Sequence, residues 1–316
     1  MILIVVLALG SALLYGVGDY FGGVAARRIP VLAASTINYA FATVVLVIAL
    51  LVTGGAWSQA AVAGGLIAGV LAAVGFLAFY AALAAGPISL MSPLMALLSS
   101  AVPVVVAIVL GDHLGPIAWI AIVLAIVGSV LIGVERRVTT RGARPRTVLF
   151  AVVAGVCLGL ATVALDNVPD DAGMVPVFLD TPLGFVLLAG LMALARAVPA
   201  VRRSVAVLDS HEPAHASSGL SPIPSPGAAY LSVDDTVQRG RARLLAATAG
   251  LFIGGANVLL MIALHAGSVA VVAVLVNLYP VATVLLAWVL LRERVNAVQG
   301  AGIVLAVAAS VMLGLA

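Results

Sequence analysis

The chain is built from long apolar runs separated by short polar segments. Ten such runs occur in its 316 residues, and each approaches the ~20 residues that an α-helix needs to cross a bilayer. We therefore predict ten membrane-spanning helices, over residues 2–24, 31–53, 62–83, 88–110, 117–134, 148–165, 174–195, 244–264, 269–291 and 298–315.

The links between the runs divide the chain into two halves. Several links are tight turns of three to five residues, which force the neighbouring spans to be antiparallel. Two links are longer. Residues 135–147 hold five Arg, and residues 198–241 are rich in Pro, Ser and Gly, which is typical of disordered segments. We expect a first repeat at 1–134, a basic linker at 135–147, and a second repeat at 148–316 with a disordered insertion at about 198–241.

The composition supports the membrane assignment. Hydrophobic residues make up 64% of the chain and charged residues 9%, whereas a soluble domain carries about 25% charged residues. The first run lacks a basic segment before it, so we interpret it as a span and not as a signal peptide. The single cysteine, Cys157, excludes an intramolecular disulfide.

The second half repeats the first. Shifting the sequence by 181 residues places residues 80–133 on residues 261–314 without a gap, and 15 of the 54 aligned pairs are identical. The aligned pairs include Gly86 with Gly267 and the acids Asp112 with Glu293. Self-similarity on this scale indicates that the two halves share one fold.

The basic residues indicate how the repeats lie in the membrane. All fifteen are Arg, and they follow runs 1, 5, 7 and 9 in numbers of two, five, six and two. The positive-inside rule places these odd-numbered loops in the cytoplasm and both termini outside. Five spans per half is an odd number, so the second half runs in the opposite direction. The sequence thus predicts an all-α integral membrane protein with ten transmembrane helices as two inverted five-helix repeats, an architecture of many secondary transporters.

Two motifs resemble a known family. Asn277-Leu278-Tyr279-Pro280, followed by Glu293, looks like the fourth-span signature of the drug/metabolite transporter superfamily, specifically of proteins with two EamA domains. Tyr15-Gly16 stands where that family has an aromatic-Gly pair. The first half departs from the signature, with Ser99 in place of the proline. The resemblance implies a ten-span secondary transporter of a small metabolite or drug-like compound in the cytoplasmic membrane, although it implies cytoplasmic termini where the Arg count indicates outside ones.

Few polar residues fall within the spans, and these are the candidates for function. An Asp at a span's centre costs about 2.5–3.5 kcal/mol to insert, so it tends to face a cavity. Asp19 is the clearest case, and Tyr15 lies one turn earlier on the same face. We predict Asp19 as a proton-linked group hydrogen-bonded by Tyr15, and expect Asp180 to be solvated near the outer interface. The other candidates for the substrate or proton pathway are Asn38, Tyr80, Asn257, Asn277 and Tyr279, with Pro280 and Pro103 as kinks.

Other functional classes stay open as alternatives. Asp166, Asp170 and Asp171 could hold Mg²⁺ against a lipid-linked diphosphate, which would make the protein a membrane enzyme, but no second acidic cluster accompanies them. A non-transporting scaffold subunit is the other alternative. No ATP-binding motif or catalytic triad is visible, so we expect no enzyme activity, no cofactor and no metal. The expected partners are a small-molecule substrate and the lipid bilayer, without nucleic acid, and a homodimer is left open.

Overall fold

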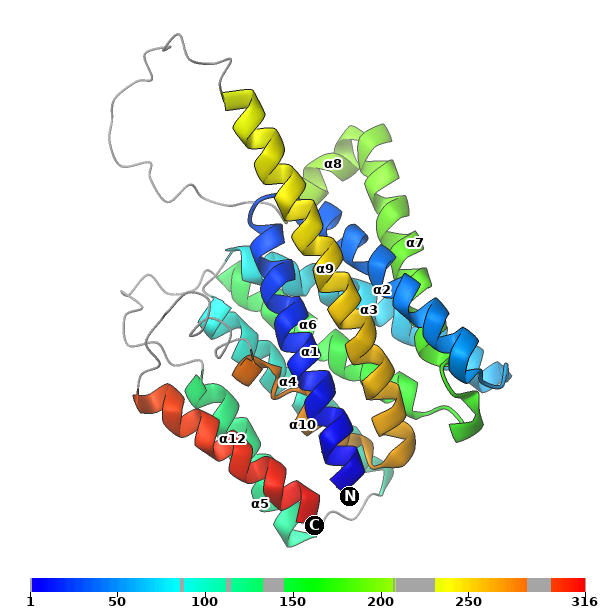
Figure 1. The fold of residues 1–316 in the computed structure, drawn as a ribbon, viewed down its shortest axis with the longest axis vertical. Helices are drawn as coiled ribbons and strands as arrows, with labels where there is room; N and C mark the ends of the chain where they lie inside the picture. The colour runs from blue at the N-terminus through cyan, green and yellow to red at the C-terminus, as the bar shows by residue number, and fades with distance from the viewer. Residues whose placement is uncertain are drawn as a thin grey trace.

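The apolar runs fold into helices, and no strand occurs in the part of the chain that the computed structural model describes (Figure 1). The described residues are 2–85, 88–111, 115–132, 145–206, 208, 231–282 and 297–315. The helices are α1 (Ile2–Ala26), α2 (Val31–Thr53), α3 (Gln59–Ala85), α4 (Ile88–Leu110), α5 (Pro116–Ile132), α6 (Pro145–Asp166), the short 3₁₀ helix η1 (Asp170–Ala172), α7 (Val175–Ala197), α8 (Pro199–Ala206), α9 (Leu231–Ala266), α10 (Val269–Val276) and α12 (Ala297–Leu315).

Six of the described helices are long and apolar enough to cross a membrane. They are α1, α2, α3, α6, α7 and the Val237–Ala266 part of α9, and shorter apolar helices accompany them. Their outward side chains include large apolar groups such as Leu51 and Val52, which are 80% and 78% exposed. Such groups are unfavourable in water but match the acyl chains of a bilayer. The chain is therefore a multi-pass membrane protein.

Most helices pack mainly against helices of the other half of the chain. Helices α1 and α2 both lie against α9, and α3 lies against α6 and α7. Helices α5 and α12 form a separate pair at one edge of the bundle (Figure 1). The two halves are thus interleaved and share one interior.

Glycines permit this close packing. A Cβ atom on Gly250 of α9 would lie 2.3 Å from the backbone oxygen of Asn38 in α2. A Cβ atom on Gly69 of α3 would lie 2.8 Å from the backbone oxygen of Asp180 in α7. Helices in a membrane associate largely through van der Waals contact between such small residues. Substituting either glycine would push two helices of opposite halves apart.

Backbone hydrogen bonds join two loops at one end of the bundle. The N–H of Ala56 donates to Asp171 O at 2.8 Å, and the N–H of Met174 donates to Gly54 O at 3.3 Å. Gly54 ends α2 with φ +71°, a conformation that favours glycine. The loop after α2 and the loop after α6 therefore lie on the same side of the bundle.

Arginines from two segments that are far apart in the sequence line one surface hollow. Arg27 and Arg28, which follow α1, share one surface hollow with Arg239 and Arg243 of α9. The loop after the first span and the segment that precedes the eighth span thus lie on one side of the bundle. The Arg residues of 135–144 and 292–294 lie outside the described residues.

The segment predicted to be disordered, residues 198–241, is helical at both ends. Helix α8 occupies Pro199–Ala206, and α9 begins at Leu231, which corrects the prediction there. Val and Arg recur at both ends, and such residues are tolerated in a helix once a longer helix continues from them. Residues 209–230, which hold most of the Pro and Ser, lie outside the described residues.

Candidate functional site

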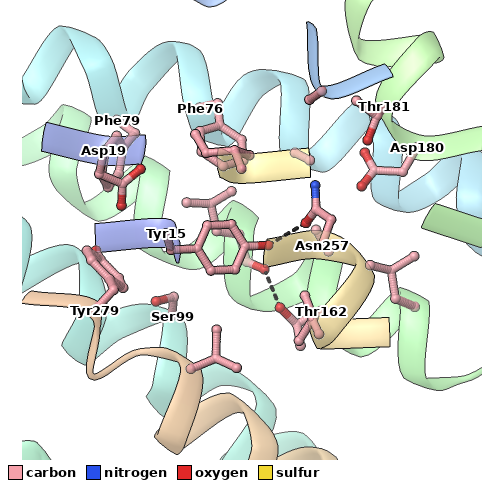
Figure 2. Close-up of a pocket in the computed structure, with 18 of the residues that line it drawn as sticks. Tyr15, Asp19, Phe76, Phe79, Ser99, Thr162, Asp180, Thr181, Asn257 and Tyr279 are labelled. Carbon is pink, nitrogen blue, oxygen red and sulfur yellow. Dashed lines mark hydrogen bonds between the residues drawn. The ribbon is translucent and has the colours of Figure 1, made fainter. Parts of the chain in front are cut away.

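A cavity of ≈ 80 Å³ lies in the interior where the two halves meet (Figure 2). Pockets for drug-sized ligands measure about 300–1,000 Å³, so a ligand of that size requires the helices to move apart. Helices of both halves line the cavity, and its polar lining residues are Tyr15, Asp19, Asn38, Tyr39, Ser99, Thr162, Asp180, Thr181, Asn257, Asn277 and Tyr279.

Helices α1 and α9 are joined by two polar contacts beside the cavity. Ser11 Oγ donates to the backbone oxygen of Ala256 at 2.9 Å. One turn further along α1, the Tyr15 hydroxyl donates to Asn257 Oδ1, as Figure 2 shows. The expected hydrogen bond from Tyr15 to Asp19 is therefore wrong. The aromatic ring of Tyr15 reaches across to the other half, because α9 supplies an amide acceptor opposite it.

Asn38 and Tyr80 form a second buried pair. Asn38 Nδ2 donates to the Tyr80 hydroxyl at 3.0 Å, and both side chains are buried. The ring of Tyr80 fits against α1 only because residue 22 is glycine, since a Cβ atom there would lie 2.2 Å from the hydroxyl oxygen. Tyr80 does not line the cavity. It holds the side chain of Asn38, which does.

One carboxylate oxygen of Asp19 is buried at the cavity without a hydrogen-bond partner among the described residues. Its side chain is 5% exposed, and Oδ1 has no hydrogen-bond partner among the described residues. The guanidinium of Arg27, eight residues away, instead donates to the backbone oxygen of Leu83 at 3.3 and 3.4 Å. Leaving a buried carboxylate oxygen unsatisfied is costly. Such a cost points to a role in which the group meets a proton or a ligand.

The ninth apolar run is broken where it passes the cavity. Helix α10 ends at Val276, Asn277 and Leu278 form a turn, and a short helical segment begins at Tyr279. Pro280 explains the break, since its ring has no N–H and would clash with the carbonyl of Val276 in a continuous helix. By contrast α4 continues through Pro103 as one helix.

The break brings one amide into the cavity. Asn277 Nδ2 donates to the backbone oxygen of Ala273 at 2.8 Å, and Asn277 Oδ1 accepts from Ser99 Oγ at 2.5 Å. The side chain of Tyr279 is 6% exposed, and its ring centroid lies 6.3 Å from that of Phe79. The ninth span therefore contributes an amide and an aromatic face to the cavity.

Aromatic rings form the wall on the α3 side. Phe76 lies 5.8 Å from Tyr39 and 6.0 Å from Phe79 between ring centroids, in edge-to-face arrangements. Such arrangements pack the rings tightly, and all three rings line the cavity. The cavity thus combines an aromatic wall with carboxylate and amide groups.

Clusters of metal-ligating side chains were a point of the sequence analysis. No group of three or more His, Cys, Asp or Glu side chains there could hold a metal ion. In the acidic segment after α6, Asp170 and Asp171 both lie in η1 and are exposed.

Comparison with known proteins identifies the family. The sequence profile of the EamA-like transporter family matches residues 2–134 and again residues 145–315. The chain belongs to the EamA-like transporter family. The resemblance inferred from the residue motifs is thus confirmed, with two EamA domains in one chain. No curated protein matches the chain.

The fold of this EamA-like protein is shared with solved structures. One of them, titled only "Crystal structure of protein", matches with a TM-score of 0.62 over 97% of this chain and 95% of that chain. The sequence identity is 16%, so this likeness shows the fold alone.

The structure brings six of the seven predicted pathway residues of this EamA-like protein together. Six of them line the cavity, namely Tyr15, Asp19, Asn38, Asn257, Asn277 and Tyr279. The seventh, Tyr80, does not line it but accepts a hydrogen bond from Asn38, which does.

One functional candidate was misplaced by sequence reasoning. Asp180 was expected to be solvated at the outer interface, but its side chain is 5% exposed and lines the cavity, with Oδ1 unpartnered among the described residues. Counting residues from the end of the span misjudged its burial, because α7 packs closely against α3 at Asp180 and against α2 at Gly184. The glycines Gly69 and Gly184, which let α7 approach α3 and α2, were a signal in the sequence.

Proposed function

We propose that this protein is a secondary-active transporter that moves a small metabolite or drug-like compound across the cytoplasmic membrane by alternating access. The observation that carries the proposal is the cavity, which is lined by polar and ionisable side chains from both halves. Transporters built from inverted repeats place the substrate between the repeats near the bilayer midplane. The family supports transport as the activity.

We infer ten spans in two inverted repeats from the way the helices pair. The helices that occupy equivalent positions in the two halves are α1 and α6, α2 and α7, α3 and α9, and α5 and α12. We can ask what happens to the observed contacts when each helix is replaced by its equivalent. The contacts between α1 and α9 then become those between α6 and α3, and the contacts between α2 and α9 become those between α7 and α3. The pairs α2–α7 and α5–α12 each map onto themselves. A two-fold relation between the halves accounts for this pattern.

The loops support the orientation inferred from the arginines. Loops after the second and sixth spans are hydrogen-bonded to each other, and Arg27 and Arg28 lie beside Arg239 and Arg243. The first and seventh loops therefore lie on one side, and the positive-inside rule favours the cytoplasm for that side. Both termini would then be outside. A reporter fused at Ala316 that is active only in the cytoplasm would contradict this orientation but not the helical arrangement.

Asp19 is the proposed proton-linked residue of the transport cycle. A buried carboxyl group with one oxygen unpartnered can hold a proton when the cavity is closed and release it when water enters. Asn257, Asn277 and Tyr279 would contribute substrate contacts.

The test uses reconstituted vesicles. A thermal-shift screen of amino acids, sugars, nucleosides and amines first identifies a ligand, and vesicles loaded with a pH-sensitive dye then report whether its movement is coupled to protons. We expect concentrative uptake under a proton gradient, and loss of that coupling in Asp19→Asn. The matched control is Asp171→Asn, which changes an exposed carboxylate outside the cavity. Facilitated but never concentrative movement that is unchanged by Asp19→Asn would overturn proton coupling.

A further inference from the structure

The cavity contains two buried carboxylates, one from each half of the protein. Asp19 comes from α1 and Asp180 from α7, and each side chain is 5% exposed. Oδ1 of each lacks a hydrogen-bond partner among the described residues. Figure 2 shows them on opposite sides of the Tyr15–Asn257 pair. The hydroxyl of Tyr15 is close enough to interact electrostatically with both.

No positive charge balances these carboxylates within the described lining. The cavity is lined by no described Arg or His. The titratable groups that face them from the surrounding elements are the hydroxyls of Tyr15, Tyr39, Tyr80 and Tyr279. The hydroxyl of Tyr15 donates to Asn257 and does not reach either carboxylate as a donor.

Two buried carboxylates, each with one unpartnered oxygen among the described residues, restrict which ligands the cavity can hold. Burying a carboxylate in its charged form is strongly unfavourable unless it meets a positive charge or hydrogen-bond donors. Two such groups in one cavity also repel each other when both are ionised. The cavity is therefore stable with both carboxyl groups protonated, or with a cation in place of protons, and it disfavours anions.

The aromatic wall favours a particular kind of cation. The rings of Phe76, Phe79 and Tyr279 line the cavity, and Phe79 lies within 6.3 Å of Tyr279 between centroids. Aromatic faces attract cations, and they also bury apolar groups. A hydrated inorganic ion would gain little from this wall, whereas an organic cation with an apolar or aromatic part would use both features.

We propose that the cavity binds a small organic cation between Asp19 and Asp180, in exchange for protons held by the same two carboxyl groups. The inference rests on the proposed transport function and adds both its substrate class and Asp180 as a second binding carboxylate. Binding of a singly charged cation releases at least one proton, because the two carboxylates then need less positive charge from protons. The protein would act as an exchanger of organic cations and protons.

Binding to the full-length protein in detergent tests this directly. The probes are methylammonium, 2-phenylethylammonium and tetraphenylphosphonium, together with 2-phenylethanol as the uncharged counterpart of the second. Affinity is measured by titration calorimetry at about pH 6 and about pH 8, where an alkylammonium stays charged. We expect 2-phenylethylammonium to bind more tightly than the alcohol. Its affinity should rise about tenfold for each unit by which the pH is raised, for every proton that binding releases. A pH dye in weak buffer counts the released protons.

Matched variants assign the effect to the two carboxylates. Asp180→Asn and Asp19→Asn should each weaken 2-phenylethylammonium binding at least about tenfold and reduce proton release. Asp180→Glu keeps the charge and should retain cation binding, which separates loss of charge from misfolding. Asp171→Asn, an exposed carboxylate outside the cavity, should change neither quantity.

Several results would overturn the inference. These are failure of all three cations to bind at millimolar concentration, equal binding of the alcohol and the ammonium, or cation binding that is unchanged in Asp180→Asn. Proton release on addition of Na⁺, with none on addition of the organic cations, would assign the carboxylates to an inorganic ion instead. Cation binding with proton release but no movement across vesicle membranes would uphold this inference and overturn the proposed transport function, so the two failures are distinct.

Discussion

The fourth span and its counterpart in the second half begin alike and end differently. Ser99 of α4 aligns with Pro280 at the 181-residue shift. Helix α4 continues through Ser99 to Leu110, whereas the ninth span is broken at Asn277 and Leu278, just before Pro280. The two dissimilar segments meet, since Ser99 Oγ donates to Asn277 Oδ1. The span without the proline is thus a continuous helix beside the cavity, whereas the span with the proline is broken and turns an amide toward it.

Introducing the proline into the first half should have the largest effect. Ser99→Pro removes a backbone donor inside α4 and clashes with the carbonyl of Met95, so we expect a loss of about 3 kcal/mol or more of unfolding free energy. Thermal unfolding in detergent measures it. Ser99→Ala is the matched control, because it removes the hydroxyl and keeps the N–H. Equal melting temperatures for the two variants would show that α4 already tolerates a break at this position.

Removing the proline from the second half should affect transport more than stability. Pro280→Ala allows the ninth span to continue as a helix through Asn277, which would turn its amide away from Ser99. We expect a well-folded protein whose transport rate falls roughly tenfold, equivalent to about 1.4 kcal/mol. The rate is measured in vesicles on the ligand found by the thermal-shift screen. Wild-type transport by Pro280→Ala would mean that the break persists without the proline or is irrelevant to the cycle.

The hydrogen bond between Ser99 and Asn277 should be measurable as a coupling free energy between substitutions of these two residues. In a double-mutant cycle, Ser99→Ala and Asn277→Ala should give a coupling free energy of about 1 kcal/mol, typical of a buried hydrogen bond. Unfolding in denaturant supplies the four stabilities. Strict additivity of the two substitutions would show that the hydrogen bond contributes nothing to stability.

The smallest change in stability is expected for Ser100, the residue that follows Ser99. Ser100 Oγ donates to the backbone oxygen of Ala96 at 2.8 Å, within its own helix. Such a local bond contributes little to a helix, so Ser100→Ala should change stability by no more than about 0.5 kcal/mol. Coupling between Ser100→Ala and Asn277→Ala should be absent. A coupling as large as that of Ser99 would mean that the contact between the segments is not specific to the Ser99 hydroxyl.

The sequence predicted the helices well because membrane burial leaves few alternatives. Helices α2 and α4 begin and end at the residues expected, and α1 and α3 differ from the prediction by two or three residues at an end. A backbone in lipid must satisfy its hydrogen bonds internally, so an apolar run of sufficient length forms a helix. Kinks were predicted at both Pro280 and Pro103 from the chemistry of proline, but only the ninth span is broken beside its proline, and α4 continues through Pro103.

Side-chain partners in the cavity were harder to predict. Tyr15 and Asp19 share a face of α1, and yet Tyr15 bonds to Asn257, a residue 242 positions away. Periodicity along one helix shows which residues are neighbours on that helix but not which residue of another helix lies opposite. The burial of Asp180 was misjudged for a similar reason, because it depends on how closely α7 packs against α3.

The interleaving of the two halves has a consequence for how the protein is made. Helix α1 leaves the ribosome long before α9, its main partner, since about 205 residues separate Ala26 from Leu231. At synthesis rates of ~5–20 residues per second, α1 waits on the order of 10–40 s with its carboxyl group facing lipid or the translocation machinery. During this time another protein or the lipid itself must cover the face of α1 that α9 covers in the finished fold.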